Sequence, residues 1–361
     1  TPTLNLPGRV ILATAPSDPD RVYALIAQGI FNGIPAYQCH IITRSDDGGE
    51  SWEMATIPPD NNITGNWAFI AWHALTAAVD PADPDRLYVG ALDVFVSDNA
   101  GDSWIKKSVW TNTNASNYVH ADQHRILFQP GSSDVMLVAT DGGVFYTDAA
   151  SASTTPFDEV NFGYNTLQMY KVALHPDPQT NFFLGGMQDN GTVFYDGNPI
   201  ENANRISGGD GGACFIDENE PDILISSHQN NNFYIFSGGQ MSGLANAWAS
   251  GNFISSVAYD YRLNTLYANA VTVVNTNQDQ VLRISGIPTP PYSGDFLNMG
   301  TGSTVPFTHV KFSEFSPGAS STLFLGTQSG RLFRVENAES DPLVTEIGSN
   351  DFPPAAISCV A

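Results

Sequence analysis

Short runs of β-branched and aromatic residues alternate with turn residues along the whole chain, and long amphipathic helical periodicity is absent. Several runs are followed by a Pro/Asp turn and a second apolar run, as at Pro19-Asp20 and Pro84-Asp85. A Gly- or Asp-rich turn and a third run ending in an aromatic residue come next. The pattern therefore predicts consecutive antiparallel strands joined by tight turns.

This strand pattern recurs roughly every 40–65 residues, and a repeat of that length built from short strands is typical of a β-propeller. We expect an all-β fold, a seven-bladed β-propeller of four-stranded antiparallel blades, with residues 1–361 as one domain. Eight blades, or a larger parent propeller, would give the same repeat. The expected first strands are residues 10–13, 75–79, 125–128, 171–174, 213–216, 255–259 and 309–312, with a partial eighth at 357–360.

The composition of the 361-residue chain limits the classes of partner that it is expected to bind. Asp and Glu number 37 against 14 Lys and Arg, which gives a formal net charge of −23. A negative field of this size without a basic stripe argues against nucleic acid as a partner. No apolar run approaches the roughly 18 residues of a membrane-spanning helix, so no membrane span is expected. The 3 cysteines cannot all pair with one another, and we expect all of them in the core.

Two hairpins of one form occur in the first part of the chain. The first has serine, aspartate, glycine and tryptophan at fixed spacing, and the second has asparagine in place of the aspartate. Their residues are Ser45, Asp47, Gly49 and Trp52, then Ser97, Asn99, Gly101 and Trp104. The S-x-D-x-G-x-x-W form resembles the Asp-box, or BNR repeat, of sialidases, sortilin-type receptors and xyloglucan-cleaving propellers. The resemblance implies a structural hairpin between third and fourth strands, on the face opposite the usual ligand site.

The order of further motifs resembles a group of large secreted bacterial propellers described as sortilin-like or glycosyl-hydrolase-like BNR proteins. The matching motifs are GR at 8–9, VHADQH at 119–124, DGG at 141–143, QMY at 168–170, GGMQDNG at 185–191 and GGDG at 208–211. This resemblance implies a secreted or cell-surface location and a longer parent protein with flanking domains. It implies no single activity.

Blade topology predicts that the polar residues of these motifs meet on one face. Entries to first strands and turns between second and third strands lie at the same end of a blade, near the central channel. The residues at such positions, with one neighbouring tyrosine, are His120, Asp122, His124, Asp141, Tyr170, Gln188, Asp189, Asn190 and Asp210. We therefore expect one polar cluster near the channel.

Paired carboxylates in this cluster would suit glycosidic cleavage. A glycoside hydrolase would use Asp122 with Asp141, Asp189 or Asp210 as general acid and base, or as acid and nucleophile. The same aspartates also suit turn capping and buried networks that set blade register. The candidate catalytic residues are therefore these four, with the structural alternative open.

Metal binding and ligand binding are the other two uses of the cluster. His120, Asp122 and His124 alternate with period two, so an extended strand would point all three to one side. Imidazoles with a carboxylate suit zinc or another transition metal, whereas carboxylates and carbonyls suit calcium. A site for a sugar or peptide would use the ligand-binding candidates His120, His124, Tyr170, Gln188 and Asn190.

Sialidase activity is disfavoured by the placement of the arginines. It needs several arginines that clamp the sialic acid carboxylate, whereas Arg21 and Arg86 lie in strand-linking turns and Arg44 flanks the first hairpin. The leading hypothesis is an extracellular binding module for glycan or protein that uses the polar face. A glycoside hydrolase is the alternative, and a structural or assembly platform is the second. None of these requires a cofactor, and bound calcium would fit.

Overall fold

The computed structural model describes residues 6–31, 34–35, 37–59, 66–163, 166–197, 204–244, 251–270, 278–348 and 352–360. Over these residues the secondary structure is entirely strands and turns, arranged in seven antiparallel sheets. The described residues form no helix long and apolar enough to cross a bilayer. The chain divides into two compact units, Thr1–Tyr164 and Asn165–Ala361, which are described in turn.

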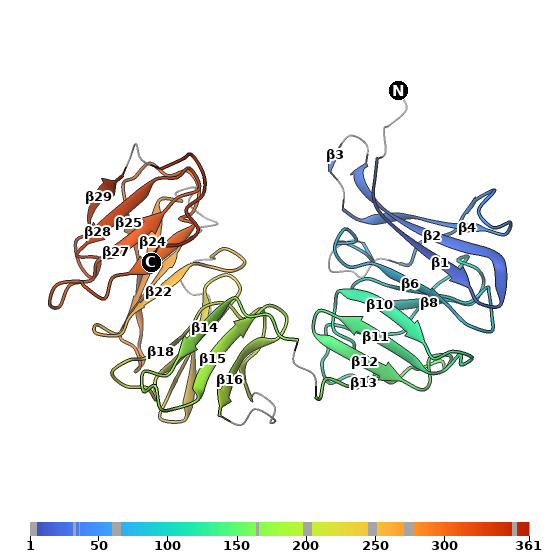
Figure 1. Ribbon diagram of the computed structural model, residues 1–361, viewed down its shortest axis with the longest axis horizontal. Coiled ribbons are helices and arrows are strands. Elements are labelled where there is room, and N and C mark those ends of the chain that lie inside the picture. Colours follow the sequence, from blue (N-terminus) through green and yellow to red (C-terminus); the bar gives the residue numbers. More distant parts are fainter. Residues whose placement is uncertain are drawn as a thin grey trace. The chain divides into compact units, whose positions relative to one another are not determined.

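The first unit contains three sheets, each an antiparallel meander (Figure 1). The first sheet comprises β1 (Leu6–Ala15), β2 (Asp18–Phe31), β4 (Cys39–Ser45) and β5 (Glu53–Met54), with β3 (Ile34–Pro35) paired to β2. The second comprises β6 (Thr76–Val79), β7 (Leu87–Gly90), β8 (Val94–Ser97) and β9 (Ile105–Lys106). The third comprises β10 (Gln123–Phe128), β11 (Met136–Thr140), β12 (Gly143–Thr147) and β13 (Asp158–Glu159).

The second unit contains four sheets of the same topology. The fourth sheet comprises β14 (Lys171–Leu174), β15 (Phe182–Met187), β16 (Gly191–Asp196) and β17 (Asn204–Ser207). The fifth comprises β18 (Cys214–Ile216), β19 (Leu224–His228), β20 (Asn232–Ser237) and β21 (Gln240–Leu244). The sixth comprises β22 (Val257–Asp260), β23 (Thr265–Asn269), β24 (Gln280–Ser285) and β25 (Ser293–Asn298). The seventh comprises β26 (His309–Phe312), β27 (Leu323–Gly326), β28 (Leu332–Glu336) and β29 (Leu343–Ile347).

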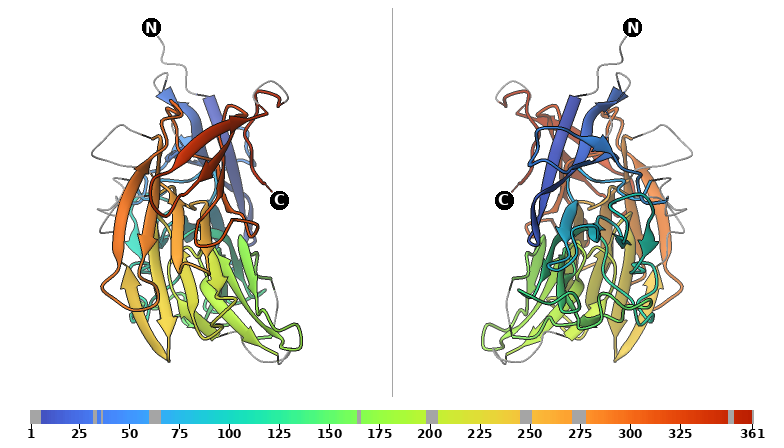
Figure 2. Two further views of the ribbon diagram at one scale, coloured as in Figure 1. Left: turned by 90° about the vertical axis from the view of Figure 1, so that its left-hand side faces the viewer. Right: turned by 90° about the vertical axis from the view of Figure 1, so that its right-hand side faces the viewer.

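These meanders have the strand order of propeller blades, and the predicted all-β fold with seven four-stranded antiparallel blades is confirmed. The first sheet differs by its extra strand. Its strands β1 and β2 are 10 and 14 residues long, dark blue in Figure 2, and β3 pairs with the far end of β2. That residues 1–361 form one domain stays a prediction.

The partial eighth strand predicted at residues 357–360 is not a strand in the structure. The Ile357 N–H instead donates to the Thr327 carbonyl at 3.0 Å, and its carbonyl accepts from Thr308 Oγ1 at 2.7 Å. These hydrogen bonds lie near the ends of β26 and β27, and no strand ladder forms over residues 352–360. Apolar β-branched residues alone did not suffice there, because a strand needs a partner.

Apolar side chains fill the space between neighbouring sheets within each unit. Leu25 of the first sheet and Leu87 of the second share one buried cluster, and Tyr267 of the sixth shares another with Leu323 of the seventh. Full burial of such a side chain stabilises the fold by about 1.5–3 kcal/mol. Cys39 and Cys214 are buried and free, as expected, but Cys359 is exposed. The expectation for Cys359 was wrong because its segment adds no strand to a core.

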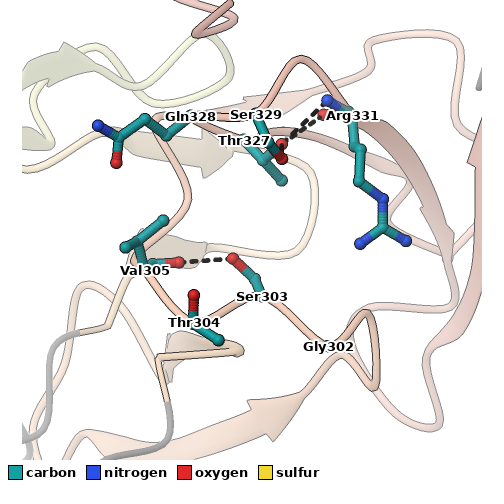
Figure 3. Close-up of a pocket in the computed structure, with 8 residues that line it drawn as sticks. All are labelled: Gly302, Ser303, Thr304, Val305, Thr327, Gln328, Ser329 and Arg331. Atoms are coloured by element: carbon teal, nitrogen blue, oxygen red, sulfur yellow. Dashed lines mark hydrogen bonds between the residues drawn. The ribbon is translucent and has the colours of Figure 1, made fainter. Parts of the chain in front are cut away.

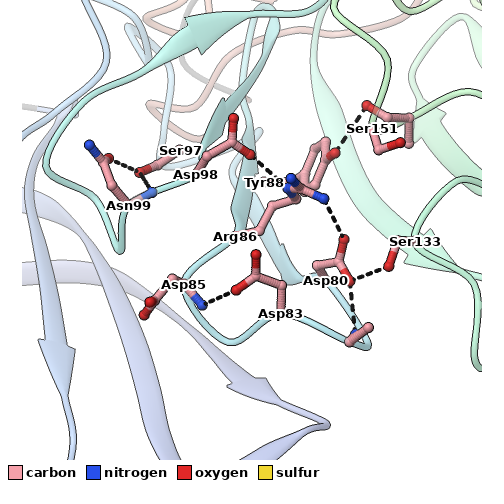
Figure 4. Close-up of polar contacts among 12 residues, drawn as sticks. Asp80, Asp83, Asp85, Arg86, Tyr88, Ser97, Asp98, Asn99, Ser133 and Ser151 are labelled. Atoms are coloured by element: carbon pink, nitrogen blue, oxygen red, sulfur yellow. Dashed lines mark hydrogen bonds and ion pairs between the residues drawn. The ribbon is translucent and has the colours of Figure 1, made fainter.

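A buried aspartate follows the first strand of the second and fifth sheets and ends the first strand of the sixth, and each of them joins its sheet to the next sheet in the chain. These residues, Asp80, Asp217 and Asp260, are called the inter-sheet aspartates. Their carboxylates accept from hydroxyls of Ser133, Tyr259 and Ser321 at 2.6, 2.6 and 2.7 Å, respectively. Each also accepts a backbone N–H in its own turn, as Figure 4 shows for Asp80. The carboxylates are thus satisfied on both sides, as burial requires.

The two hairpins that share the serine, glycine and tryptophan pattern, at residues 45–52 and 97–104, connect β4 to β5 and β8 to β9. These are the third and fourth strands of their sheets. Ser45 Oγ accepts the Gly49 N–H at 2.8 Å, and Asp47 Oδ1 accepts the Ser51 N–H at 2.8 Å. Gly49 has φ of 99°, a conformation that favours glycine. Trp52 Nε1 donates to the Gly49 carbonyl at 3.0 Å. The side chains of this hairpin therefore satisfy hydrogen-bonding groups of the turn's own backbone.

The second hairpin repeats these contacts with asparagine. Ser97 Oγ accepts the Gly101 N–H at 2.8 Å, and Asn99 Oδ1 accepts the Ser103 N–H at 2.9 Å. The amide oxygen thus takes the place of the carboxylate as acceptor. Trp104 Nε1 reaches the Thr56 carbonyl of the first sheet at 3.1 Å, so this hairpin also joins two sheets.

Candidate functional site

The third sheet brings His124 and Asp141 together. His124 lies in β10, and Asp141 directly follows β11 in the turn to β12. The register of β10 with β11 shifts between Gln123 and Arg125, which leaves His124 without a cross-strand partner, as at a β-bulge. A bulge re-aims a side chain locally, and here His124 Nε2 lies 2.5 Å from Asp141 Oδ1. Blade topology predicted this proximity.

The loop before β6 adds His73, which the sequence did not single out. His73 Nε2 lies 2.9 Å from Asp141 Oδ2, and the two imidazoles meet edge to face with their centroids 4.9 Å apart. One carboxylate therefore lies between two imidazoles. The His73 carbonyl accepts a hydrogen bond from the Arg9 guanidinium, which holds this loop in place. The signal available in the sequence was position: His73 enters a first strand just as His120 and His124 do.

The electrostatics of the pair follow from these contacts. The hydrogen bond that His124 makes to the Asp141 carboxylate raises the pKa of His124 above its ordinary value. Burial opposes ionisation of Asp141, but hydrogen bonds from His124 and His73 outweigh it and lower the pKa of Asp141. The carboxylate is thus ionised and directed at the two rings.

Asp122 lies beside this pair but in a turn. Its φ of 64° is in the left-handed region, and its Oδ1 is buried with no hydrogen-bond partner among the described residues. Burial raises the pKa of Asp122, and the negative charge of Asp141 adds to the effect. The Asp122 carboxylate therefore lies near Asp141 with one acceptor atom that no described residue satisfies.

His120 lies outside the strand that carries His124. The strand begins only at Gln123, so the period-two alternation expected of His120, Asp122 and His124 does not apply to the first two. The His120 ring packs over Gly142, where a Cβ would lie 2.3 Å from its Cγ, and its Nδ1 is 3.1 Å from the Ala121 carbonyl. Gly142 is needed for this close approach.

Two exposed aromatic side chains extend the site. Trp72 is 58% exposed and Tyr37 is 53% exposed. Their rings meet edge to face at 6.3 Å between centroids, and Trp72 lies 5.5 Å from the His73 ring. We call Tyr37, Trp72, His73 and His124 the aromatic row, because each ring contacts the next. The row connects a solvent-exposed apolar surface to the Asp141 carboxylate.

The candidates of the second unit are linked by hydrogen bonds within that unit. Asp189, with φ of 62° in the β15–β16 turn, donates its N–H to Asp210 Oδ1 at 3.0 Å. The Asp210 N–H donates to Gln229 Oε1 at 3.0 Å. The Tyr170 hydroxyl donates to Gln188 Oε1 at 2.6 Å.

Asn190 belongs to the same turn. Its side-chain amide donates to the Gln188 carbonyl at 3.1 Å. Asp210 caps a turn amide and links the fourth sheet to the fifth, which is the structural role left open for it. Gln229, which the sequence did not single out, extends the group to the β19–β20 turn.

One group of described residues has donor atoms close enough to share a metal ion. The ligand atoms of His73, His124 and Asp141 all lie within 4.8 Å of one another. Two imidazole nitrogens do not suit calcium, which prefers oxygen ligands.

The candidate pocket of the seventh sheet, drawn in Figure 3, has a volume of about 250 Å³ and is lined by residues such as Ser303, Thr327 and Arg331. Arg331 is paired with Glu346 at 2.7 Å, and none of the sequence candidates lines that pocket.

No protein-family model and no curated protein matches the chain. Among solved structures, an ancestral GH74 enzyme is 14% identical over 96% of this chain and 39% of that chain, with a TM-score of 0.30. The GH74 enzyme of Niastella koreensis is 12% identical over 96% of this chain and 59% of that chain, with a TM-score of 0.32. YCF48 bound to D1 peptide is 10% identical over 96% and 85%, with a TM-score of 0.29. The chain spans less than two thirds of the two GH74 enzymes, and likeness at this level says nothing about activity.

Proposed function

We propose that this chain is a glycan-binding module whose binding surface in the first unit is the aromatic row beside Asp141 and Asp122. The observation that carries the proposal is the exposure of Trp72 and Tyr37 next to a polar cluster. A sugar ring offers an apolar C–H face and a rim of hydroxyls. Exposed aromatic faces with a few placed polar groups are the complement of such a ligand.

The polar groups beside the row supply hydrogen-bond acceptors. Asp141 and Asp122 carry carboxylate oxygens beside the row, and the buried Asp122 Oδ1 has no hydrogen-bond partner among the described residues. Charge-assisted bonds from sugar hydroxyls to such oxygens are strong. The net charge of −23 repels anionic sugars, so neutral glycans are the proposed ligands.

The proposal includes an extracellular location and membership of the Asp-box class, as one module of a longer bacterial protein. Support comes from the two hairpins, in which Ser97 and Asn99 repeat the acceptor pattern of Ser45 and Asp47. The surplus of acidic residues suits a secreted protein surface.

A screen of neutral glycans on an array tests the proposal. Trp72→Ala should weaken binding of each hit at least about tenfold, which corresponds to about 1.4 kcal/mol, and Tyr37→Ala should weaken it less. Phe315→Ala is the matched control, because Phe315 is 96% exposed but lies in the second unit. Hits that bind Trp72→Ala and wild type equally would contradict the assignment.

Two further readouts separate the alternatives. Product analysis after incubation with each bound glycan detects cleavage, and cleavage that is lost in Asp122→Asn would favour the glycoside hydrolase. Absence of any glycan hit, with capture of a protein that depends on Trp72, would favour a protein-binding module.

A further inference from the structure

The cluster between the two imidazoles has the donor set of a transition-metal site. His73 Nε2 and His124 Nε2 lie 2.9 and 2.5 Å from separate oxygens of Asp141. Two histidines and one carboxylate, with a position left for solvent or ligand, suit zinc and other divalent transition metals. We propose that His73, His124 and Asp141 bind a divalent transition-metal ion, with Zn²⁺ as the best match.

The three ligands come from separate segments that the fold holds in place. His73 lies in the loop before β6, which the Arg9 guanidinium anchors through the His73 carbonyl. His124 is directed by the irregular register of β10, and Asp141 is fixed in the turn after β11. Such placement by backbone features is what a preorganised site requires.

The distances fit an ion after small side-chain rotations. Zn–N and Zn–O bonds of about 2.0–2.2 Å place tetrahedral ligand atoms about 3.4 Å apart. The ligand atoms already lie within 4.8 Å of one another, so movements of about 1 Å suffice. The metal would replace the protons that the imidazoles now share with the carboxylate.

The charge around the site also favours a cation. Asp122 contributes a second carboxylate next to Asp141, and its buried Oδ1 has no partner among the described residues. Arg9 is the opposing positive charge, set against two carboxylates. His73, His124 and Asp141 are each partly exposed, so an ion can reach them from solvent.

An ion held by these three ligands would leave at least one coordination site open, and Trp72 contacts the ring of one ligand, His73. Three protein ligands with an open position are the arrangement of zinc sites that contact a substrate or ligand, whereas structural zinc sites are closed by four. The metal proposal does not depend on glycan binding, because the ion is detected directly.

The test uses the full chain without a histidine tag, stripped of metal by a chelator. Titration with ZnCl₂ by calorimetry should give one site per chain with a dissociation constant of about 10 µM or lower. Co²⁺ should give visible d–d absorption of a low-coordinate site with nitrogen and oxygen ligands. X-ray absorption of the Zn²⁺ form should show two imidazoles, a readout that requires no variant.

Substitutions then assign the ligands. His73→Gln, His124→Gln and Asp141→Asn should each weaken Zn²⁺ binding at least about tenfold, with the circular dichroism spectrum unchanged. His120→Gln is the matched control and should bind as wild type does. Absence of a stoichiometric site, or a site lost in His120→Gln and kept in His73→Gln, would overturn the proposal. Spectra without imidazole ligands would overturn it even if a variant failed to fold.

Discussion

Replacement of Asp260 by alanine should destabilise the second unit by about 3 kcal/mol. The Asp260 side chain is fully buried, and its Oδ2 lies 3.0 Å from Arg262 Nη2 and 2.7 Å from Ser321 Oγ. Its Oδ1 accepts from the Arg262 N–H at 3.0 Å and from Nε at 3.1 Å. Removal of one partner of a buried ion pair costs about 3–5 kcal/mol. We take the lower end because Arg262 keeps some solvent exposure and two carbonyl acceptors.

Variants that remove only part of these contacts should lose less free energy of unfolding. Ser321→Ala removes one charge-assisted hydrogen bond and should cost about 1.5 kcal/mol, since the carboxylate keeps Arg262. Because the two residues share one contact, the loss in the double variant should be smaller than the sum of the single losses. Asp295→Ala breaks the exposed pair with Arg283 and should cost less than about 1 kcal/mol.

The measurement is the free energy of unfolding, from urea denaturation followed by circular dichroism. A loss below about 1 kcal/mol in Asp260→Ala, or a loss equal to that of Asp295→Ala, would refute the reasoning. So would strict additivity of Asp260→Ala and Ser321→Ala.

Three further predictions concern packing, pH and metal. Gly186→Ala should cost about 2–3 kcal/mol, because the new Cβ would lie 2.1 Å from the Gly212 carbonyl oxygen, and an unchanged melting temperature would contradict this. Burial lowers the pKa of His309, with Lys171 and Lys311 adding to it, so the unfolded chain takes up the proton first as the pH falls through about 6.5. The free energy of unfolding should therefore fall below that pH and level off below the folded-state pKa of His309. His309→Gln should flatten this dependence on pH. Identical pH profiles of the wild type and His309→Gln would contradict the prediction. Free Zn²⁺ at about 100 times its dissociation constant should stabilise the wild type by about 2.7 kcal/mol and leave His73→Gln unchanged in a thermal melt.

The blade topology was predictable because its signals are local. Each Pro/Asp turn, such as Pro84-Asp85, lies between two apolar runs that pair directly with one another. The expected strands 171–174 and 309–312 match β14 and β26. Residues 357–360 had the same composition but form no strand in the structure, which composition alone does not reveal.

The site was only half predictable for the opposite reason. His124 and Asp141 are 17 residues apart within one blade, so the meander itself brings them together. His73 is 68 residues from Asp141 and comes from the neighbouring sheet. Its position before a first strand was the available signal, but its approach to Asp141 also depends on packing between sheets and on the irregular register at His124. The alternation argument failed for His120 because it assumed an extended strand where a turn occurs.

The inter-sheet aspartates couple the unfolding of each sheet to that of its neighbour. Asp217 couples the fifth sheet to the sixth, and Asp260 couples the sixth to the seventh. In a chain of repeated elements, the coupling free energy between neighbours decides whether one element opens alone or takes the next with it. The last three sheets should therefore exchange their amide hydrogens as one cooperative unit, with a common opening free energy for β19, β23 and β27. A single buried carboxylate at each junction thus adds to the coupling that sets the size of the cooperative unit.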